Sequence, residues 1–143
     1  MDSGYKNYPQ SAKYGHAAED RFDRIRGNHI VRKATREEDM AHGWDRLDVE
    51  FGKVGIKGMA AVQRGWPPQD RLFPIEFINR DGKQPGWVFK PNDIQAYEVT
   101  EGFLMVPRTA LLPFACGLTL TECGCVWVPR ERLKGFEIVL DKG

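Results

Sequence analysis

Three charged residues, Glu19, Asp45 and Lys57, have the types and the order that metal-dependent phosphodiester hydrolysis needs. Carboxylate oxygens hold Mg²⁺ or Mn²⁺, and the bound metal polarises a phosphate and lowers the pKa of an attacking water. A lysine beside the metal stabilises the negative charge that develops during the reaction. The three residues predict a hydrolytic site if one helix and two strands bring them together.

The segment 44–58 is predicted to form two short strands joined by a tight turn at Gly52-Lys53, because apolar and polar residues alternate along it. In the second strand, positions 53, 55 and 57 share one face. Lys57 is therefore on the correct face to stand beside a metal ligand at position 55, but Gly55 offers none. The apolar positions of the two strands are Leu47, Val49, Phe51, Val54 and Ile56.

An apolar stripe at helical spacing predicts a helix between Gly15 and Gly27, and this helix carries Glu19. Thr35 and Glu38 form a capping box that begins a second, brief helix. A short β-leaning segment is expected between these helices, and a third short helix at 107–112. Further strands are predicted at 72–78, 86–89, 95–99, 102–106, 125–128 and 136–140.

This order of elements predicts one α+β, α/β/α-like domain over residues 15–143, with a mixed sheet flanked by short helices. Residues 1–14 are predicted to be a flexible N-terminal segment. A length of 143 residues suits one domain with a core. The net charge of +1 creates no strong field, so nucleic-acid binding would need a local basic patch.

No apolar run is long enough to span a bilayer and no secretory signal is expected at the start, so no membrane partner is predicted. The odd number of cysteines then indicates a reducing, cytoplasmic setting. Cys116, Cys123 and Cys125 lack the spacing of a zinc site and are interpreted as small residues around a turn. A metal-binding accessory module at these cysteines is the weakest alternative.

The runs Gly15–Phe22, Trp44-Asp45 and Gly55-Ile56-Lys57 resemble the PD-(D/E)XK nuclease superfamily, and in particular its small phage and bacterial restriction-endonuclease-like or resolvase-like members. The resemblance covers about residues 15 to 110. It implies a restriction-endonuclease-like core in which Glu19 is the helical acid, Asp45 the strand aspartate and Lys57 the motif lysine. Further similar segments are 68–70, 75–77, 86–87 and 103–108.

The family's second carboxylate has no counterpart, because Gly55 stands at its position. Asp48 is a rival for the strand aspartate, although its alternation is also that of a solvated strand residue. Glu76, expected on the neighbouring strand, and Glu50 are candidate substitutes for the missing carboxylate. Asp45 and Glu19 are thus the expected metal ligands, with Asp48 and Glu76 as alternatives.

The resemblance implies a Mg²⁺- or Mn²⁺-dependent endodeoxyribonuclease with DNA as its partner, and Gly55 implies reduced or lost activity. The alternative is a non-catalytic module of nuclease-like fold that binds nucleic acid or a protein. Gln63 and Arg64 follow the lysine strand and are candidate nucleic-acid contacts. His42 is a candidate general base, but a solvated histidine at a helix end is the favoured interpretation. A homodimer is left open.

Overall fold

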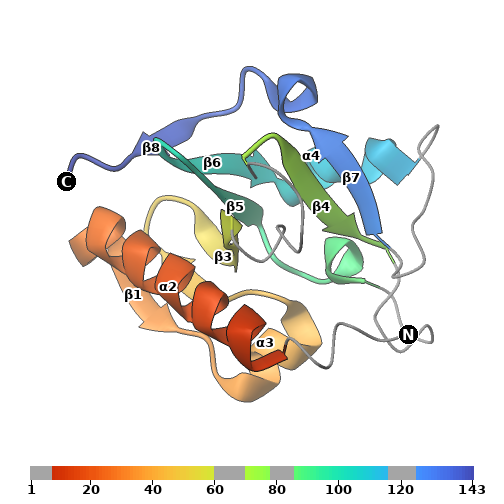
Figure 1. Cartoon of the computed structure of the whole chain (residues 1–143). Coiled ribbons are helices and arrows are strands. Elements are labelled where there is room, and N and C mark those ends of the chain that lie inside the picture. Colours follow the sequence, from red (N-terminus) through yellow and green to blue (C-terminus); the bar gives the residue numbers. More distant parts are fainter. Residues whose placement is uncertain (1–7, 60–69, 78–85, 116–124) are drawn as a thin grey trace.

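The computed structural model describes residues 8–59, 70–77, 86–115 and 125–143, and the side chains from residue 16 onward within these ranges. Helix α2 (Tyr8–Arg26) lies against one face of a six-stranded sheet, and a two-stranded sheet lies against the other (Figure 1). The two faces of the larger sheet therefore have separate cores.

The six-stranded sheet has the strand order β1-β2-β3-β5-β6-β8. Its one parallel pair is β3 and β5, and all other neighbours are antiparallel, which confirms the expected α+β fold with a mixed sheet. Strands β4 and β7 form the smaller sheet. The strands are β1 (Ile30–Lys33), β2 (Arg46–Asp48), β3 (Gly52–Lys57), β4 (Leu72–Glu76), β5 (Ile94–Val99), β6 (Gly102–Pro107), β7 (Cys125–Pro129) and β8 (Ile138–Leu140).

Helix α2 buries Ala18 and Phe22 against Val54 and Ile56 of β3, so the expected stripe and the core positions expected in the second strand are confirmed. The Phe22 ring packs edge-on against Phe103 of β6, with 5.2 Å between centroids. The helix begins at Tyr8, and not at Gly15 as predicted. A glycine inside a helix lowers the helix stability by only about 1 kcal/mol relative to alanine. The helix therefore continues through Gly15, because the turns on both sides are helical.

On the opposite face, the two-stranded sheet contributes Phe73, Ile75 and Val128 to a second core with Tyr97 and Leu104 of the larger sheet. The Tyr97 hydroxyl donates to the Pro74 carbonyl at 2.7 Å. This bond attaches β4 to β5 without a shared strand edge. The sheet face that carries Lys57 is therefore largely covered.

The turn between β2 and β3 consists of residues 49–51, so the predicted turn at Gly52-Lys53 was wrong. Asp48 ends β2 because its Oδ1 accepts the backbone N–H groups of Glu50 and Phe51, at 2.8 and 3.2 Å. This bonding is typical of an aspartate that begins a turn. Val49 consequently lies in the turn with 69% of its surface exposed and is not a core residue.

The predicted strand at 86–89 is instead a 3-10 helix, η3 (Trp87–Phe89). Its first residues lie against the end of β4, where Gly86 N–H donates to the Phe77 carbonyl at 2.9 Å. A Cβ on Gly86 would lie 2.1 Å from the Glu76 carbonyl oxygen, so only glycine permits this approach. The chain therefore forms a helical turn where it crosses the end of β4, and it does not pair there as a strand.

Most remaining predictions are confirmed. The capping box of Thr35 and Glu38 begins α3 (Arg36–His42), and β5 and β6 form the expected hairpin. Helix α4 (Arg108–Leu111) continues into the 3-10 helix η4 (Leu112–Ala115), and a further 3-10 helix, η5 (Arg130–Leu133), follows β7. The last 3-10 helix, η1 (Gly27–His29), connects α2 to β1. Among the described residues, no helix is long and apolar enough to cross a membrane.

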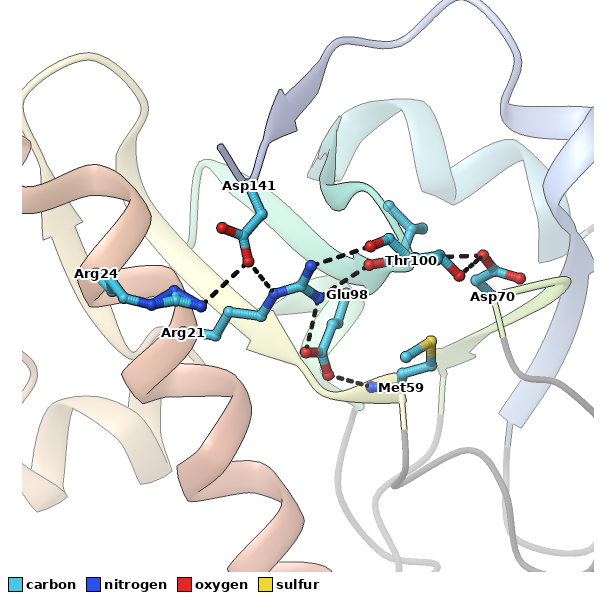
Figure 2. A network of polar contacts seen from close by, with 8 residues as sticks. Arg21, Arg24, Met59, Asp70, Glu98, Thr100 and Asp141 are labelled. Carbon is cyan, nitrogen blue, oxygen red and sulfur yellow. Dashed lines mark hydrogen bonds and ion pairs between the residues drawn. The ribbon is translucent and has the colours of Figure 1, made fainter. Parts of the chain in front are cut away.

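Arg21 fixes the position of α2 over the sheet (Figure 2). Its guanidinium donates to Glu98 at 3.0 Å, to the Thr100 carbonyl at 3.1 Å and to Asp141 at 2.8 Å. The other oxygen of Glu98 accepts the Met59 N–H at 2.9 Å, two residues beyond β3. One network therefore holds both the helix that carries Glu19 and the end of the strand that carries Lys57.

Candidate functional site

Asp45 immediately precedes β2, beside the part of β3 that extends past its pairing with β2. Its backbone N–H donates to the Val54 carbonyl at 2.8 Å. Its side-chain Oδ2 then accepts the Ile56 N–H at 2.7 Å, a donor that β2 no longer reaches. The carboxylate is therefore fixed at the free edge of β3, one residue before Lys57.

Glu19 is held near this edge by Arg46, which projects from β2 toward α2. The Arg46 guanidinium donates to Glu19 Oε1 at 3.0 Å and to both oxygens of Asp23, at 2.8 and 3.1 Å. Only 3% of the Arg46 side chain is exposed, so its charge needs these carboxylates. The residue that orients Glu19 was not predicted, although its alternation with Asp48 along β2 placed both on one face.

Lys57 ends β3 with its Nζ 5.6 Å from the ring centroid of Trp87, a cation–π geometry. No described carboxylate forms an ion pair with Lys57. Its charge nevertheless acts on Asp45 and on Asp39 of α3, and favours the ionised form of both. Within the part of the chain that the structure describes, Lys57 is therefore a cation without a carboxylate partner.

The pKa of Asp45 is raised from 3.8 to about 7. Burial is the largest cause, and the negative charges of Glu19 and Asp39 raise the pKa further, while the Ile56 N–H bond and Lys57 lower it. Asp39 also has a raised pKa, because it loses part of its hydration, and Lys57 and Lys90 oppose that rise. Glu19, Asp39 and Lys57 thus all act on the Asp45 carboxyl, and we call these four residues the β3 site.

The sequence prediction brought together Glu19, Asp45 and Lys57 but missed Asp39. The missed signal is the capping-box helix itself. It ends at Gly43 in the left-handed conformation at φ +71°, and the chain then returns to Asp45. Because this seven-residue helix closes at Gly43, two residues before Asp45, its acidic residue Asp39 lies near the same edge of β3.

Gly55 lies on β3 opposite Gln95 of β5, because the two strands pair in parallel at this register. Gln95 is 1% exposed. The Gly43 carbonyl lies on the same side and accepts Asn92 Nδ2 at 3.2 Å. Gln95 was not predicted from the sequence, because no local sequence pattern indicates that these two distant strands pair in parallel.

The residues as they lie do not fit a complete metal centre. Glu19 Oε1 is engaged by Arg46 and Asp45 Oδ2 by the Ile56 N–H. The described part of the chain contains no group of three or more His, Cys, Asp or Glu side chains that could hold a metal ion. Binding of Mg²⁺ or Mn²⁺ therefore stays a prediction. Asp45, Glu19 and Asp39 are the acidic residues of the β3 site that could serve as ligands.

The alternative ligands lie elsewhere. Asp48 was expected to be solvated, but its side chain is fully buried. Its carboxylate accepts hydrogen bonds from the Arg26 guanidinium at 2.8 and 3.0 Å on the α2 face. Burial opposes its ionisation, but the bonds from Arg26 and from two backbone N–H groups hold the pKa of Asp48 below its ordinary value. Glu50 is bound to Arg26 as well. Glu76 is on β4 in the other sheet, not on a neighbour of β3, and accepts the Trp87 N–H at 3.3 Å.

His42 is exposed at the end of α3, as the favoured interpretation expected. Cys125 is half-buried in β7. Gln63, Arg64, Cys116 and Cys123 lie outside the described residues. An open cavity of about 570 Å³ lies between α2 and β8, away from the β3 site, and is lined by residues 24–26 and 137–143.

The chain matches no protein-family model, no curated protein and no solved structure. The resemblance to PD-(D/E)XK nucleases therefore depends on the residues themselves. The geometry adds that the charge of Glu19 on α2 and the charge of Lys57 on β3 both act on the Asp45 carboxyl, which lies between α3 and β2.

Proposed function

We propose that this chain is a nuclease-fold protein that binds DNA at the β3 site and has lost most or all cutting activity. The observation that carries the proposal is that Asp45 is acted on by the charges of both Glu19 and Lys57, although the three residues are far apart in the sequence. The absence of a carboxylate at Gly55 favours binding over cutting, because hydrolysis of this type uses two strand carboxylates.

Cations at the site support DNA as the ligand. Lys57 has no ion pair with any described carboxylate, and Lys90 lies close enough to act on Asp39. Lys90 Nζ also donates to the Met40 carbonyl at 2.8 Å, which fixes it beside α3. Lys57 and Lys90 would supply the phosphate contacts at a site that also holds Asp39 and Asp45, in a chain whose net charge is only +1.

Binding is tested by fluorescence anisotropy with duplex and branched DNA for the wild type, Lys57→Ala and a matched lysine variant. Lys134→Ala is the control, because Lys134 is exposed beyond the 3-10 helix η5. Lys57→Ala should weaken binding to all sequences and reduce the slope of log K against log salt by about 1. Equal affinities of the two variants, or no affinity in the wild type, would overturn the proposal.

The second candidate is a metal-dependent endodeoxyribonuclease that uses Mg²⁺ or Mn²⁺. It is favoured by the raised pKa of Asp45, which burial causes first and the charges of Glu19 and Asp39 increase further, because a divalent cation would stabilise the ionised carboxylate against all three effects. Nicking of supercoiled plasmid with each metal is the assay, with Lys57→Ala alongside. Metal-dependent nicking by the wild type alone would establish this candidate, and equal background from both proteins would reject it.

A flat salt dependence would point to a different ligand. Phosphate contacts release counterions, so DNA affinity must fall as salt rises. If the wild type shows no such fall, the β3 site does not bind DNA, and a protein partner becomes the occupant to search for.

A further inference from the structure

The place that a side chain at residue 55 would occupy is already filled from the neighbouring strand. A Cβ built on Gly55 would lie 2.7 Å from Gln95 Oε1 and 3.1 Å from the Gly43 carbonyl oxygen. The first distance is shorter than real Cβ contacts allow. Gly55 and Gln95 pair directly between β3 and β5, so both project to the face that also carries Lys57.

We infer that the Gln95 amide oxygen takes the place of the missing carboxylate, so that this side of the β3 site is a weak ligand for divalent cations. The inference deepens the proposed function, because it gives a physical reason for DNA binding without cutting at this site. A neutral amide adds no negative charge to Asp45. The oxygen that faces residue 55 is uncharged, and it holds a divalent cation more weakly than a carboxylate would.

The polarity of Gln95 has no explanation in packing alone. Among the described residues Gln95 Nε2 has no hydrogen-bond partner, although it is buried. An unpartnered buried donor costs about 1–3 kcal/mol, which an apolar side chain of similar length would not. A polar group held at this cost beside Gly55 is better explained by a role in the β3 site than by packing.

The test is Mn²⁺ affinity, measured at pH 8 by calorimetry and by electron paramagnetic resonance, for a double-mutant cycle. The members are the wild type, Gly55→Asp, Gln95→Ala and the double variant Gly55→Asp/Gln95→Ala. The wild type should bind weakly. Gly55→Asp alone should gain little, because Gln95 occupies the space, and the double variant should bind about tenfold tighter than either single variant.

Asn28→Asp is the charge control, because Asn28 is exposed in the 3-10 helix η1 and gains the same charge there. It should leave Mn²⁺ affinity unchanged. The inference is overturned if the wild type binds Mn²⁺ as tightly as the double variant, or if Gly55→Asp alone gains as much as the double variant.

The Gly43 carbonyl must also move slightly to admit a residue-55 side chain, so the double variant could unfold, which circular dichroism would detect. Gln95→Glu then carries the test, because it keeps Gly55 and changes one amide to a carboxylate of equal size. It should bind Mn²⁺ about tenfold tighter than the wild type, and no gain would overturn the inference. Because these readouts need no DNA, a failure of DNA binding would count against the proposed function alone.

Discussion

Asp45→Asn should stabilise the protein at alkaline pH and have little effect at acidic pH. The carboxyl has a pKa of about 7 in the folded protein against 3.8 in its ordinary state. Burial is the main cause, followed by the charges of Glu19 and Asp39. The folded state therefore prefers the neutral carboxyl, which asparagine imitates while it keeps an oxygen for the Ile56 N–H.

The size and the pH window follow from the two pKa values of Asp45. The folded state binds its proton more tightly, so the contribution of Asp45 to stability is fully present below pH 4 and is lost as the pH rises to 7. The rise of roughly three units, at about 1.36 kcal/mol each, corresponds to about 4 kcal/mol. This value is an upper limit for Asp45→Asn above pH 8.

Urea unfolding at pH 4.5, 6, 7 and 8.5, followed by tryptophan fluorescence, gives the free energy of unfolding for both proteins. The gap between them should open between pH 4.5 and 7 and then stay constant. Carbon NMR of the Asp45 carboxyl should show a midpoint near 7.

Asp48→Asn is the matched control, because the same substitution three residues away should have the opposite sign. The pKa of Asp48 is lowered by Arg26 and backbone N–H groups, against its burial. Its ionised form therefore stabilises the fold above the ordinary pKa, and this contribution is lost as the pH falls. Parallel curves for the wild type and Asp45→Asn, or a more stable wild type at pH 8.5, would refute the reasoning.

Two further predictions concern the scaffold. Arg26→Met should cost about 3–5 kcal/mol, because it leaves Asp48 charged and buried, and Arg26→Met/Asp48→Leu should recover most of that loss in urea unfolding. Gly102→Ala should cost about 3 kcal/mol or more, since its Cβ would lie 1.9 Å from the Val139 carbonyl oxygen between β6 and β8. Gly135→Ala has open space and a φ of +95°, so it should cost only about 1–2 kcal/mol, and equal losses for the two glycines would contradict the argument.

Local patterns in the sequence predicted most of the elements but not their pairing. The capping box of Thr35, the stripe through Phe22 and the hairpin across Thr100 depend on neighbours within a few residues. The turn after Asp48 was misplaced, because the alternation continues through Val49 while the Asp48 carboxylate binds the next backbone donors. Alternation describes side-chain character and does not include such local competition.

The candidate site was predictable to the same extent. The order of Glu19, Asp45 and Lys57 indicated the cluster, because Glu19 and Lys57 lie on elements with a clear pattern and Asp45 directly precedes one. Gln95 was not predictable, since its place beside Gly55 depends on a parallel pairing across a long connection. Such a contact between two distant strands leaves no trace in the local sequence.

Charged side chains are paired on the α2 face of the β2–β3 region, whereas polar groups on the other side of β3 are not, and this contrast marks the candidate site. On the α2 face Arg26 is paired with Asp48, and Arg46 with Glu19 and Asp23, so the buried charges there are satisfied. At the free edge of β3 the pKa of the Asp45 carboxyl is raised to about 7, and on the neighbouring strand β5 the Gln95 amide has an unpartnered donor among the described residues. Because the protein pairs the buried charges on its α2 face, the same kind of pairing would be possible beside β3. Polar groups that remain unbalanced beside an available lysine are therefore better explained by an external ligand than by the needs of folding.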